Sequence, residues 1–220
     1  MTSSYLRPAI LIALAAASLA GCGGKATFEI TGAVTGLQYP GLVLVETFSG
    51  QTITITDITK TTFAFPNSIE YGTEYNVIVR ETPSGQPAHQ DCVRTGGNNG
   101  TAGLRTSITM GFSCQLLPHS VGGSISLTST SGSYLGLKLI NGSNDLTPFT
   151  VTDAVAQKAY AYPGITYTMP FGISIFAQPS DLVTKCKLVP KVAIPGAQNE
   201  MVAGVMGDTD IIIDVVCAKP

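Results

Sequence analysis

The residues best suited to chemistry in this chain are its two histidines and a group of aspartates near the C-terminus. A metal site on His89 and His119 would need further ligands at a defined spacing, and the sequence provides none. Asp208, Asp210 and Asp214 could offer carboxylate oxygens to calcium, but no glycine-bearing loop of about twelve residues surrounds them. We therefore expect solvated loop histidines and edge carboxylates, with no metal and no cofactor.

No motif for nucleophilic catalysis or phosphate binding accompanies these residues. The nucleophile elbow Gly-x-Ser-x-Gly does not occur. The run Gly96-Gly-Asn-Asn-Gly100 is followed neither by Lys-Ser or Lys-Thr nor by a helix, so it does not resemble a phosphate loop. The net charge is −2 with 12% charged residues, and no basic patch would attract nucleic acid. The sequence predicts a protein that is not an enzyme and has no catalytic residues.

Four of the five cysteines are predicted to form disulfides. Cys92, Cys114, Cys186 and Cys217 allow three pairings, and free buried thiols are the alternative. We favour Cys92–Cys114 and Cys186–Cys217 because each pair falls within one of two sequence repeats. Closing loops of 22 and 31 residues would stabilise each repeat by about 3–4 kcal/mol in the loop-entropy model.

The two halves of the chain repeat the same signals in the same order, about 90–100 residues apart, which indicates a tandem duplication. In the first half the signals are Ile30–Val34, Gly41–Val45, Phe63-Ala-Phe65, Tyr75–Val79, Gln86-Pro87, Cys92 and a closing run Ile108–Cys114. In the second they are Val121–Ile125, Gly136–Ile140, Tyr160-Ala-Tyr162, Phe171–Ile175, Gln178-Pro179, Cys186 and Ile211–Cys217.

Both halves have the residue pattern of β-strands. Gln51–Thr56 alternates apolar and polar residues, which is typical of a half-buried strand. In the closing runs, Cys114 and Cys217 share a face with the apolar residues, so each should lie on the buried side of its strand. Turn signals recur every 8–12 residues or so, and no convincing amphipathic helix appears. The pattern predicts an all-β chain of two tandem antiparallel β-sandwich domains, each with one intradomain disulfide.

The N-terminus resembles that of bacterial lipoproteins. An apolar run, Ala9–Ala20, leads into Leu19-Ala20-Gly21-Cys22, which resembles a lipobox. The resemblance implies that residues 1–21 are a cleaved signal peptide, that Cys22 is acylated, for example with palmitate, and that the chain is anchored to a membrane. An ordinary signal peptide with a chance cysteine is the alternative. Gly23 after the cysteine, in place of Asp, resembles lipoproteins that are sorted to the outer membrane.

The remaining chain divides into a tether at 22–25, a first repeat at 26–114, a linker at 115–118 and a second repeat at 119–220. The repeats resemble the tandem immunoglobulin-like sandwiches of bacterial surface and envelope lipoproteins, through Gly32-Ala-Val-Thr-Gly-Leu37, Gly41-Leu-Val-Leu44 and Tyr75-Asn-Val-Ile-Val79. The second repeat departs from that pattern at Phe171–Ile175 and in an expanded loop before its last strand. The resemblance implies a fold and a location in the cell envelope, and it carries no catalytic residues.

Three functions compete at this stage. The first is a non-catalytic envelope lipoprotein whose repeats bind a ligand, mediate adhesion or act as spacers. The second is a periplasm-facing accessory subunit of an envelope assembly, and the third is a hydrolase of envelope polymer, which would need paired acids in a cleft. The loops 87–103 and 188–205 are the candidate surfaces for a protein or glycan partner, and exposed strand edges could accept a partner's strand. No nucleic-acid partner is expected, and which face of the membrane the chain occupies stays open.

Overall fold

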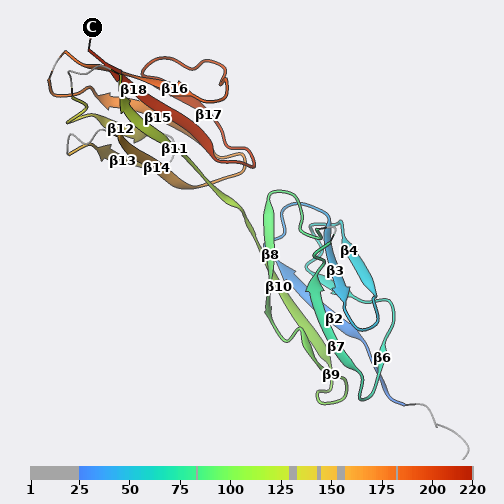
Figure 1. The fold of residues 1–220 in the computed structure, drawn as a ribbon. Coiled ribbons are helices and arrows are strands. Elements are labelled where there is room, and N and C mark those ends of the chain that lie inside the picture. Colours follow the sequence, from blue (N-terminus) through green and yellow to red (C-terminus); the bar gives the residue numbers. More distant parts are fainter. Residues whose placement is uncertain are drawn as a thin grey trace, which may run out of the picture. The chain divides into compact units, whose positions relative to one another are not determined.

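The fold is given by a computed structural model that describes residues 25–82, 84–128, 133–142, 145–152, 157–181 and 183–219. Every regular element among these residues is a β-strand (Figure 1). The predicted signal peptide and Cys22 lie outside the described residues. No helix in the described part of the chain is long and apolar enough to cross a bilayer. The all-β prediction is confirmed.

Ten strands precede residue 117, and eight follow it. The first set is β1 (Thr27–Phe28), β2 (Ile30–Thr35), β3 (Leu42–Glu46), β4 (Thr52–Ile55), β5 (Thr62–Ala64), β6 (Ile69–Glu70), β7 (Glu74–Val79), β8 (Gln90–Gly96), β9 (Asn99–Thr101) and β10 (Ile108–Leu116). The second set is β11 (Pro118–Leu127), β12 (Lys138–Asn141), β13 (Asp145–Thr150), β14 (Gln157–Thr166), β15 (Pro170–Ala177), β16 (Lys185–Pro190), β17 (Met201–Val205) and β18 (Ile211–Ala218).

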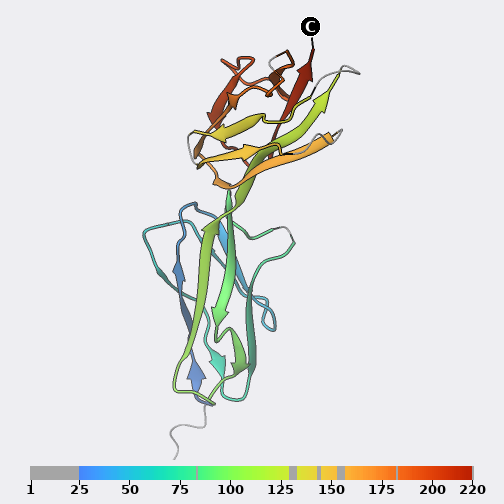
Figure 2. The ribbon, with the colours of Figure 1, turned by 90° about the vertical axis from the view of Figure 1, so that its left-hand side faces the viewer.

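Each half of the chain forms a sandwich of two four-stranded sheets (Figures 1 and 2). The first sandwich has the strand orders β5-β2-β10-β8 and β4-β3-β7-β9, and β1 and β6 form a separate two-stranded ribbon. The second sandwich has the orders β14-β11-β18-β16 and β13-β12-β15-β17. The two sets of orders correspond strand for strand, so the duplication inferred from the sequence is also a duplication of topology.

The sheets are mixed rather than purely antiparallel. The first and last strands of each sandwich pair in parallel, with Ile30 opposite Ile108 and Val121 opposite Ile211. A parallel pair needs a long connection between its strands, and here nearly a whole sandwich supplies it. All the other strand pairs with a described register are antiparallel.

The core of the second sandwich is one apolar cluster between its two sheets. Alternation along β18 sends Ile213, Val215 and Cys217 inward, and all three are fully buried. Phe171 and Ile173 of β15 are buried in the same cluster. Disulfides join Cys92 to Cys114 and Cys186 to Cys217, which are the predicted pairings. Both second cysteines are buried, as the strand alternation predicted.

A glycine opposite an aromatic residue marks the same place in both sandwiches. Gly32 of β2 lies opposite Phe63, and Gly123 of β11 lies opposite Tyr160. A Cβ at Gly32 would come within 2.3 Å of the Phe63 ring, and a Cβ at Gly123 within 2.3 Å of the carbonyl oxygen of Ile213. Glycine is therefore required there for close packing, which explains why it interrupts two otherwise β-forming segments.

The chain folds into two compact units. Of the described residues, the first unit contains those within 25–35, 41–85 and 93–113, and the second contains those from 114 onward together with the short segments 36–40 and 86–92. In the predicted linker, residues 115–118, β10 ends at Leu116 and β11 begins at Pro118.

Both segments predicted as binding loops contain strands, and the first is mostly strand, which corrects that part of the prediction. Residues 87–103 contain β8 and β9, and residues 188–205 contain the end of β16 and all of β17. Glycine and asparagine have low strand propensity, which is why the first segment resembled a loop. The segment nonetheless supplies an edge strand to each sheet of the first sandwich, β8 to one and β9 to the other. Gln90 and Cys92 are buried, and the Asn98 carbonyl oxygen accepts a hydrogen bond from the N–H of Val77. What remains of the second loop is residues 191–200.

Candidate functional site

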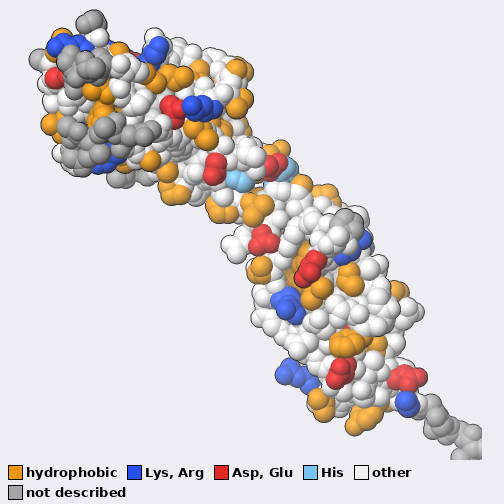
Figure 3. All heavy atoms as spheres, in the orientation of Figure 1, with side chains coloured by type: hydrophobic (Ala, Val, Ile, Leu, Met, Phe, Trp, Pro, Cys, Tyr) orange, Lys and Arg blue, Asp and Glu red, His pale blue; other side chains and the backbone are white. Residues whose placement is uncertain are grey.

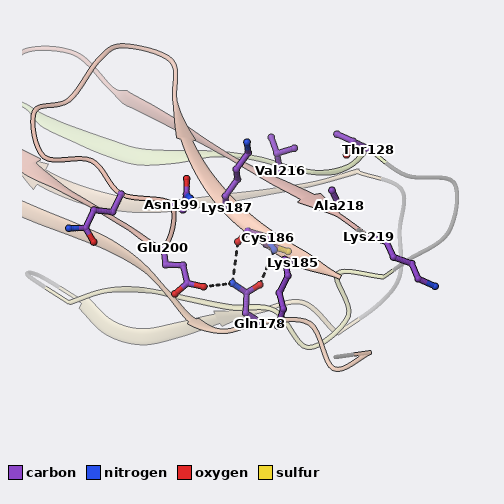
Figure 4. Close-up of a pocket in the computed structure, with 11 residues that line it drawn as sticks. Thr128, Gln178, Lys185, Cys186, Lys187, Asn199, Glu200, Val216, Ala218 and Lys219 are labelled. Carbon is purple, nitrogen blue, oxygen red and sulfur yellow. Dashed lines mark hydrogen bonds between the residues drawn. The ribbon is translucent and has the colours of Figure 1, made fainter. Parts of the chain in front are cut away.

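A large groove lies on the second sandwich, beside the edge strand β16. It has a volume of about 960 Å³. Three lysines, Lys185, Lys187 and Lys219, line it, and Glu200 is its one acidic lining residue (Figure 4). The remaining lining residues are Thr128, Gln178, Cys186, Gln198, Asn199, Val216 and Ala218.

Strand alternation explains which side chains face this groove. In β16, Lys185 and Lys187 are exposed, whereas Cys186 and Leu188 are buried in the core. The register with β18 sets Lys187 opposite Val216 and Lys185 opposite Ala218. The outer surface of this sheet edge is therefore basic, with small apolar side chains beside the lysines.

Gln178 forms one wall of the groove by binding the backbone of the edge strand. Its Oε1 accepts the N–H of Cys186 at 2.9 Å, and its Nε2 donates to the Cys186 carbonyl oxygen at 3.1 Å (Figure 4). The same Nε2 also donates to Glu200 Oε1 at 2.8 Å. These contacts occupy backbone groups that would otherwise be open at the sheet edge.

The first sandwich contains the same arrangement. Gln86 Oε1 accepts the N–H of Cys92 at 2.8 Å, and Gln86 Nε2 donates to the Cys92 carbonyl oxygen at 3.1 Å. Asp91 takes the place of Glu200, with its Oδ1 at 2.9 Å from Gln86 Nε2. The glutamine of each Gln-Pro turn thus holds the first cysteine of its repeat. The sequence repeat contained this signal, but it suggested only a turn.

Segment 191–200 packs against the sandwich at both of its ends. The N–H of Leu188 donates to the Asn199 carbonyl oxygen at 2.7 Å. This bond occupies another backbone N–H that points outward from the edge strand β16. Ile194 packs against the apolar core. Lys191 Nζ lies 2.7 Å from Asp214 Oδ2. The expanded segment is therefore a fixed part of the sandwich surface.

Asp214 is held as a carboxylate by the groups around it. Burial raises its pKa, but hydrogen bonds from Lys191 and from the N–H and hydroxyl of Ser124 outweigh burial and hold the pKa below its usual value. The aspartate joins β11, β18 and segment 191–200, so its role is structural. This differs from the solvated edge carboxylate that we expected.

Positively charged side chains outnumber negatively charged ones in the lining of the groove. The ammonium groups of Lys185, Lys187 and Lys219 outnumber the single carboxylate of Glu200, which also binds Gln178. All three lysines are exposed, and exposed charges are screened within about 8–10 Å at physiological salt. Figure 3 shows how sparse charged side chains are on the visible face. The arrangement suits weak, salt-sensitive binding of a negatively charged group.

The residues first considered for metal binding form two pairs, in which His89 Nδ1 contacts Asp208 Oδ1 and His119 lies near Asp210. His119 lies in β11, and its Nδ1 is 3.7 Å from Asp210 Oδ1. His89 lies in the turn before β8. Asp210 also accepts the N–H of Ser120 at 2.8 Å. Among the described residues, no group of three or more His, Cys, Asp or Glu side chains is arranged to hold a metal ion.

No family model matches the sequence, and no curated protein matches it significantly. Among solved structures, the major pilin of Streptococcus pyogenes is 10% identical with a TM-score of 0.32, over 89% of this chain and 99% of the pilin. The T-13 pilin from serotype GAS131465 of that species is 10% identical with a TM-score of 0.30, over 90% and 98%. TM-scores this low carry no weight for fold or function.

Proposed function

We propose that this chain is a non-catalytic, lipid-anchored protein of the bacterial cell envelope, whose disulfide-closed sandwiches carry and space a binding surface. The proposal rests on the lipobox-like run that ends at Cys22 and on the position of the first strand. β1 begins at Thr27, five residues after Cys22, and five extended residues reach about 17 Å. Acylation of Cys22 would therefore hold the first sandwich close to the membrane.

Two disulfides support an exported location. Disulfides persist in oxidising compartments and are rare in the cytosol, and both pairs here are buried within their sandwiches. The short tether also favours the second candidate function, an accessory subunit that faces the periplasm and contacts other envelope proteins near the membrane.

Metabolic labelling tests the anchor. Cells that express the full chain are grown with an alkyne-bearing palmitate, and the protein is then isolated and coupled to a fluorophore. We expect label on the wild type and on Gly24→Ala, and none on Cys22→Ala. Label that persists in Cys22→Ala, or a wild type without label, would refute lipid attachment at this residue.

Protease treatment of intact cells, with a periplasmic control protein, distinguishes the two candidate functions. Digestion with the control intact would place the sandwiches at the surface and favour adhesion or ligand binding. Protection until the outer membrane is opened would favour the periplasmic accessory subunit. The variant Gly23→Asp tests sorting, because we expect it to move the lipidated protein from the outer to the inner membrane fraction.

Of the two predicted partner segments, 87–103 and 188–205, the second adjoins the lysine-lined groove. We infer that an acidic partner, such as an acidic polysaccharide, binds there. Dextran sulfate serves as the probe and neutral dextran as its control. We expect Lys185→Ser/Lys187→Ser to weaken retention of the full chain on dextran sulfate, and Lys60→Ser/Arg105→Ser, which removes the same charge from exposed sites elsewhere, to leave it unchanged. Equal loss in both variants would mean non-specific charge attraction.

A further inference from the structure

Strand β17 leaves hydrogen-bonding groups open at the edge of its sheet. It pairs on one side only, with β15. The N–H of Ile175 donates to the Glu200 carbonyl oxygen, and the N–H of Met206 donates to that of Met169. The backbone groups of the even-numbered residues along β17 therefore point toward β15. Backbone groups alternate along a strand, so those of Met201, Ala203 and Val205 point outward.

Only one of these outward groups has a partner in the described part of the chain. Gln198 N donates to the Met201 carbonyl oxygen at 2.8 Å. The N–H and carbonyl of Ala203 and of Val205 make no hydrogen bond to any residue that the structure describes. β16, the nearby edge of the other sheet, differs because Gln178 binds the outward N–H and carbonyl of Cys186 and Asn199 accepts the outward N–H of Leu188.

The exposed side chains of β17 are apolar and carry no charge. Met201 is 46% exposed and Val205 is 62% exposed, while Val202 between them is fully buried. Phe176 of β15 is 64% exposed and lies on the same face of the sheet. Met201 lies opposite Ser174 of β15, and Phe176 is two residues further along that strand. Soluble proteins normally protect such edges with charge, proline or a covering segment.

The corresponding strand of the first sandwich lacks this character. β9 has three residues, Asn99-Gly-Thr101, whereas β17 has five, Met201-Val-Ala-Gly-Val205. The two strands hold the same place in the sheet order. The two copies of the duplicated unit therefore differ here in strand length and polarity, and the common fold does not require a long apolar edge strand.

We propose that β17 pairs antiparallel with β17 of a second copy of this chain, about a two-fold axis at Ala203. Ala203 then exchanges two N–H···O bonds with the partner's Ala203, and Met201 lies opposite the partner's Val205. The strand suits itself as occupant because it brings no like charges together, and a two-fold axis sets the same apolar surface on both sides. A charged peptide would find no opposite charge on β17. The inference goes beyond the proposed function and does not depend on lipid at Cys22.

Cysteine cross-linking of the full chain in its own cells tests the pairing. Directly opposed residues in a hydrogen-bonded antiparallel pair have Cβ atoms about 5.5 Å apart, which is farther than a disulfide favours, so a short bis-maleimide is added to join the two thiols. We expect Ala203→Cys to give a dimer on non-reducing gels, and Thr54→Cys, on the exposed edge strand β4, to give none. Absence of a dimer, an equal dimer from both variants, or adducts to another protein would each overturn the proposal.

Charge pairs test the register, and both variants place charge on exposed side chains. In the Ala203→Cys background, the variant Met201→Lys/Val205→Lys places a lysine of one chain opposite a lysine of the other at each end of the strand pair. Met201→Glu/Val205→Lys opposes a glutamate to a lysine instead. We expect cross-linking to fall about tenfold in the first variant and to persist in the second. Equal cross-linking in the two variants, whether high or low, would overturn antiparallel pairing about Ala203.

Discussion

Gln178 makes two hydrogen bonds to the backbone of Cys186, one to its N–H and one to its carbonyl oxygen. Cys186 lies opposite Cys217 in β18, with the two Cα atoms 3.9 Å apart. This close spacing belongs to an antiparallel pair that exchanges no backbone bonds. The backbone groups of Cys186 therefore point outward at the edge, and the glutamine amide takes the place of a neighbouring strand.

The first prediction follows from this contact. Gln178→Ala leaves a backbone donor and acceptor without their partner at a half-exposed edge. We expect the free energy of unfolding to fall by about 1–2 kcal/mol, measured by denaturant unfolding. Gln198→Ala, which shortens an exposed side chain of the same groove, is the control and should change stability by less than about 0.5 kcal/mol. Equal effects in the two variants would show that the backbone contacts of Gln178 contribute little.

The second prediction concerns the buried carboxylate of Glu46, at the end of β3. Glu46 is 1% exposed, and it accepts hydrogen bonds from Phe48 N, Ser49 N and Asn76 N, and from the Ser49 hydroxyl. Burial raises the pKa of Glu46, but these hydrogen bonds together outweigh it, so the pKa lies below its usual value of 4.5. A lowered pKa means that the carboxylate stabilises the folded state above about pH 4.5, and that this stability is lost as the pH falls through the folded-state pKa.

We therefore expect Glu46→Gln to cost about 2 kcal/mol at pH 7, and the difference from the wild type to shrink below about pH 4.5. Urea unfolding of both proteins from about pH 7 to about pH 3 measures this difference. Glu81→Gln, at an exposed position, is the control. A stability difference between Glu46→Gln and the wild type that does not change with pH would contradict a role for the charged form.

The alternation of apolar and polar residues predicted correctly which side chains of the closing strands are buried. It could do so because a strand buried on one face has apolar residues at every second position. Ile108, Met110, Phe112 and Cys114 are all buried, and Ile213, Val215 and Cys217 are too. The parallel pairing of β2 with β10 could not be inferred in this way, since it joins residues 78 apart, Ile30 and Ile108. No local pattern records which distant strand becomes a neighbour.

The site was harder to predict than the fold because its contacts run from side chain to backbone. Gln178 and Gln86 stood out only as parts of Gln-Pro turns, and nothing in their types shows that their amides bind an edge strand. Asn98 lies in a glycine-rich run that suggests a loop, yet its side chain is buried and its Nδ2 donates to the Gly111 carbonyl oxygen at 3.2 Å. Open and occupied strand edges become visible only when the register is known.

The third prediction uses the glycine of β11 that lies opposite Tyr160. Gly123→Ala would bring a methyl group within 2.3 Å of the Ile213 carbonyl oxygen, which belongs to the backbone of a central strand. We expect a loss of about 2–3 kcal/mol from overpacking. The control is Gly207→Ala, where an added Cβ would meet no atom within 4 Å. Thermal unfolding of both variants gives the comparison, and similar melting temperatures for the two would contradict the packing argument.

The fourth prediction compares the two disulfides. Cys186 and Cys217 are separated by 31 residues, and Cys92 and Cys114 by 22. If a disulfide acts mainly on the unfolded chain, replacing either pair by alanine costs about 3–4 kcal/mol, and the longer loop costs only about 0.3 kcal/mol more. Denaturant unfolding of Cys92→Ala/Cys114→Ala and Cys186→Ala/Cys217→Ala measures both losses. A difference between the variants above about 1 kcal/mol would show that packing around one disulfide, rather than loop closure, dominates its contribution.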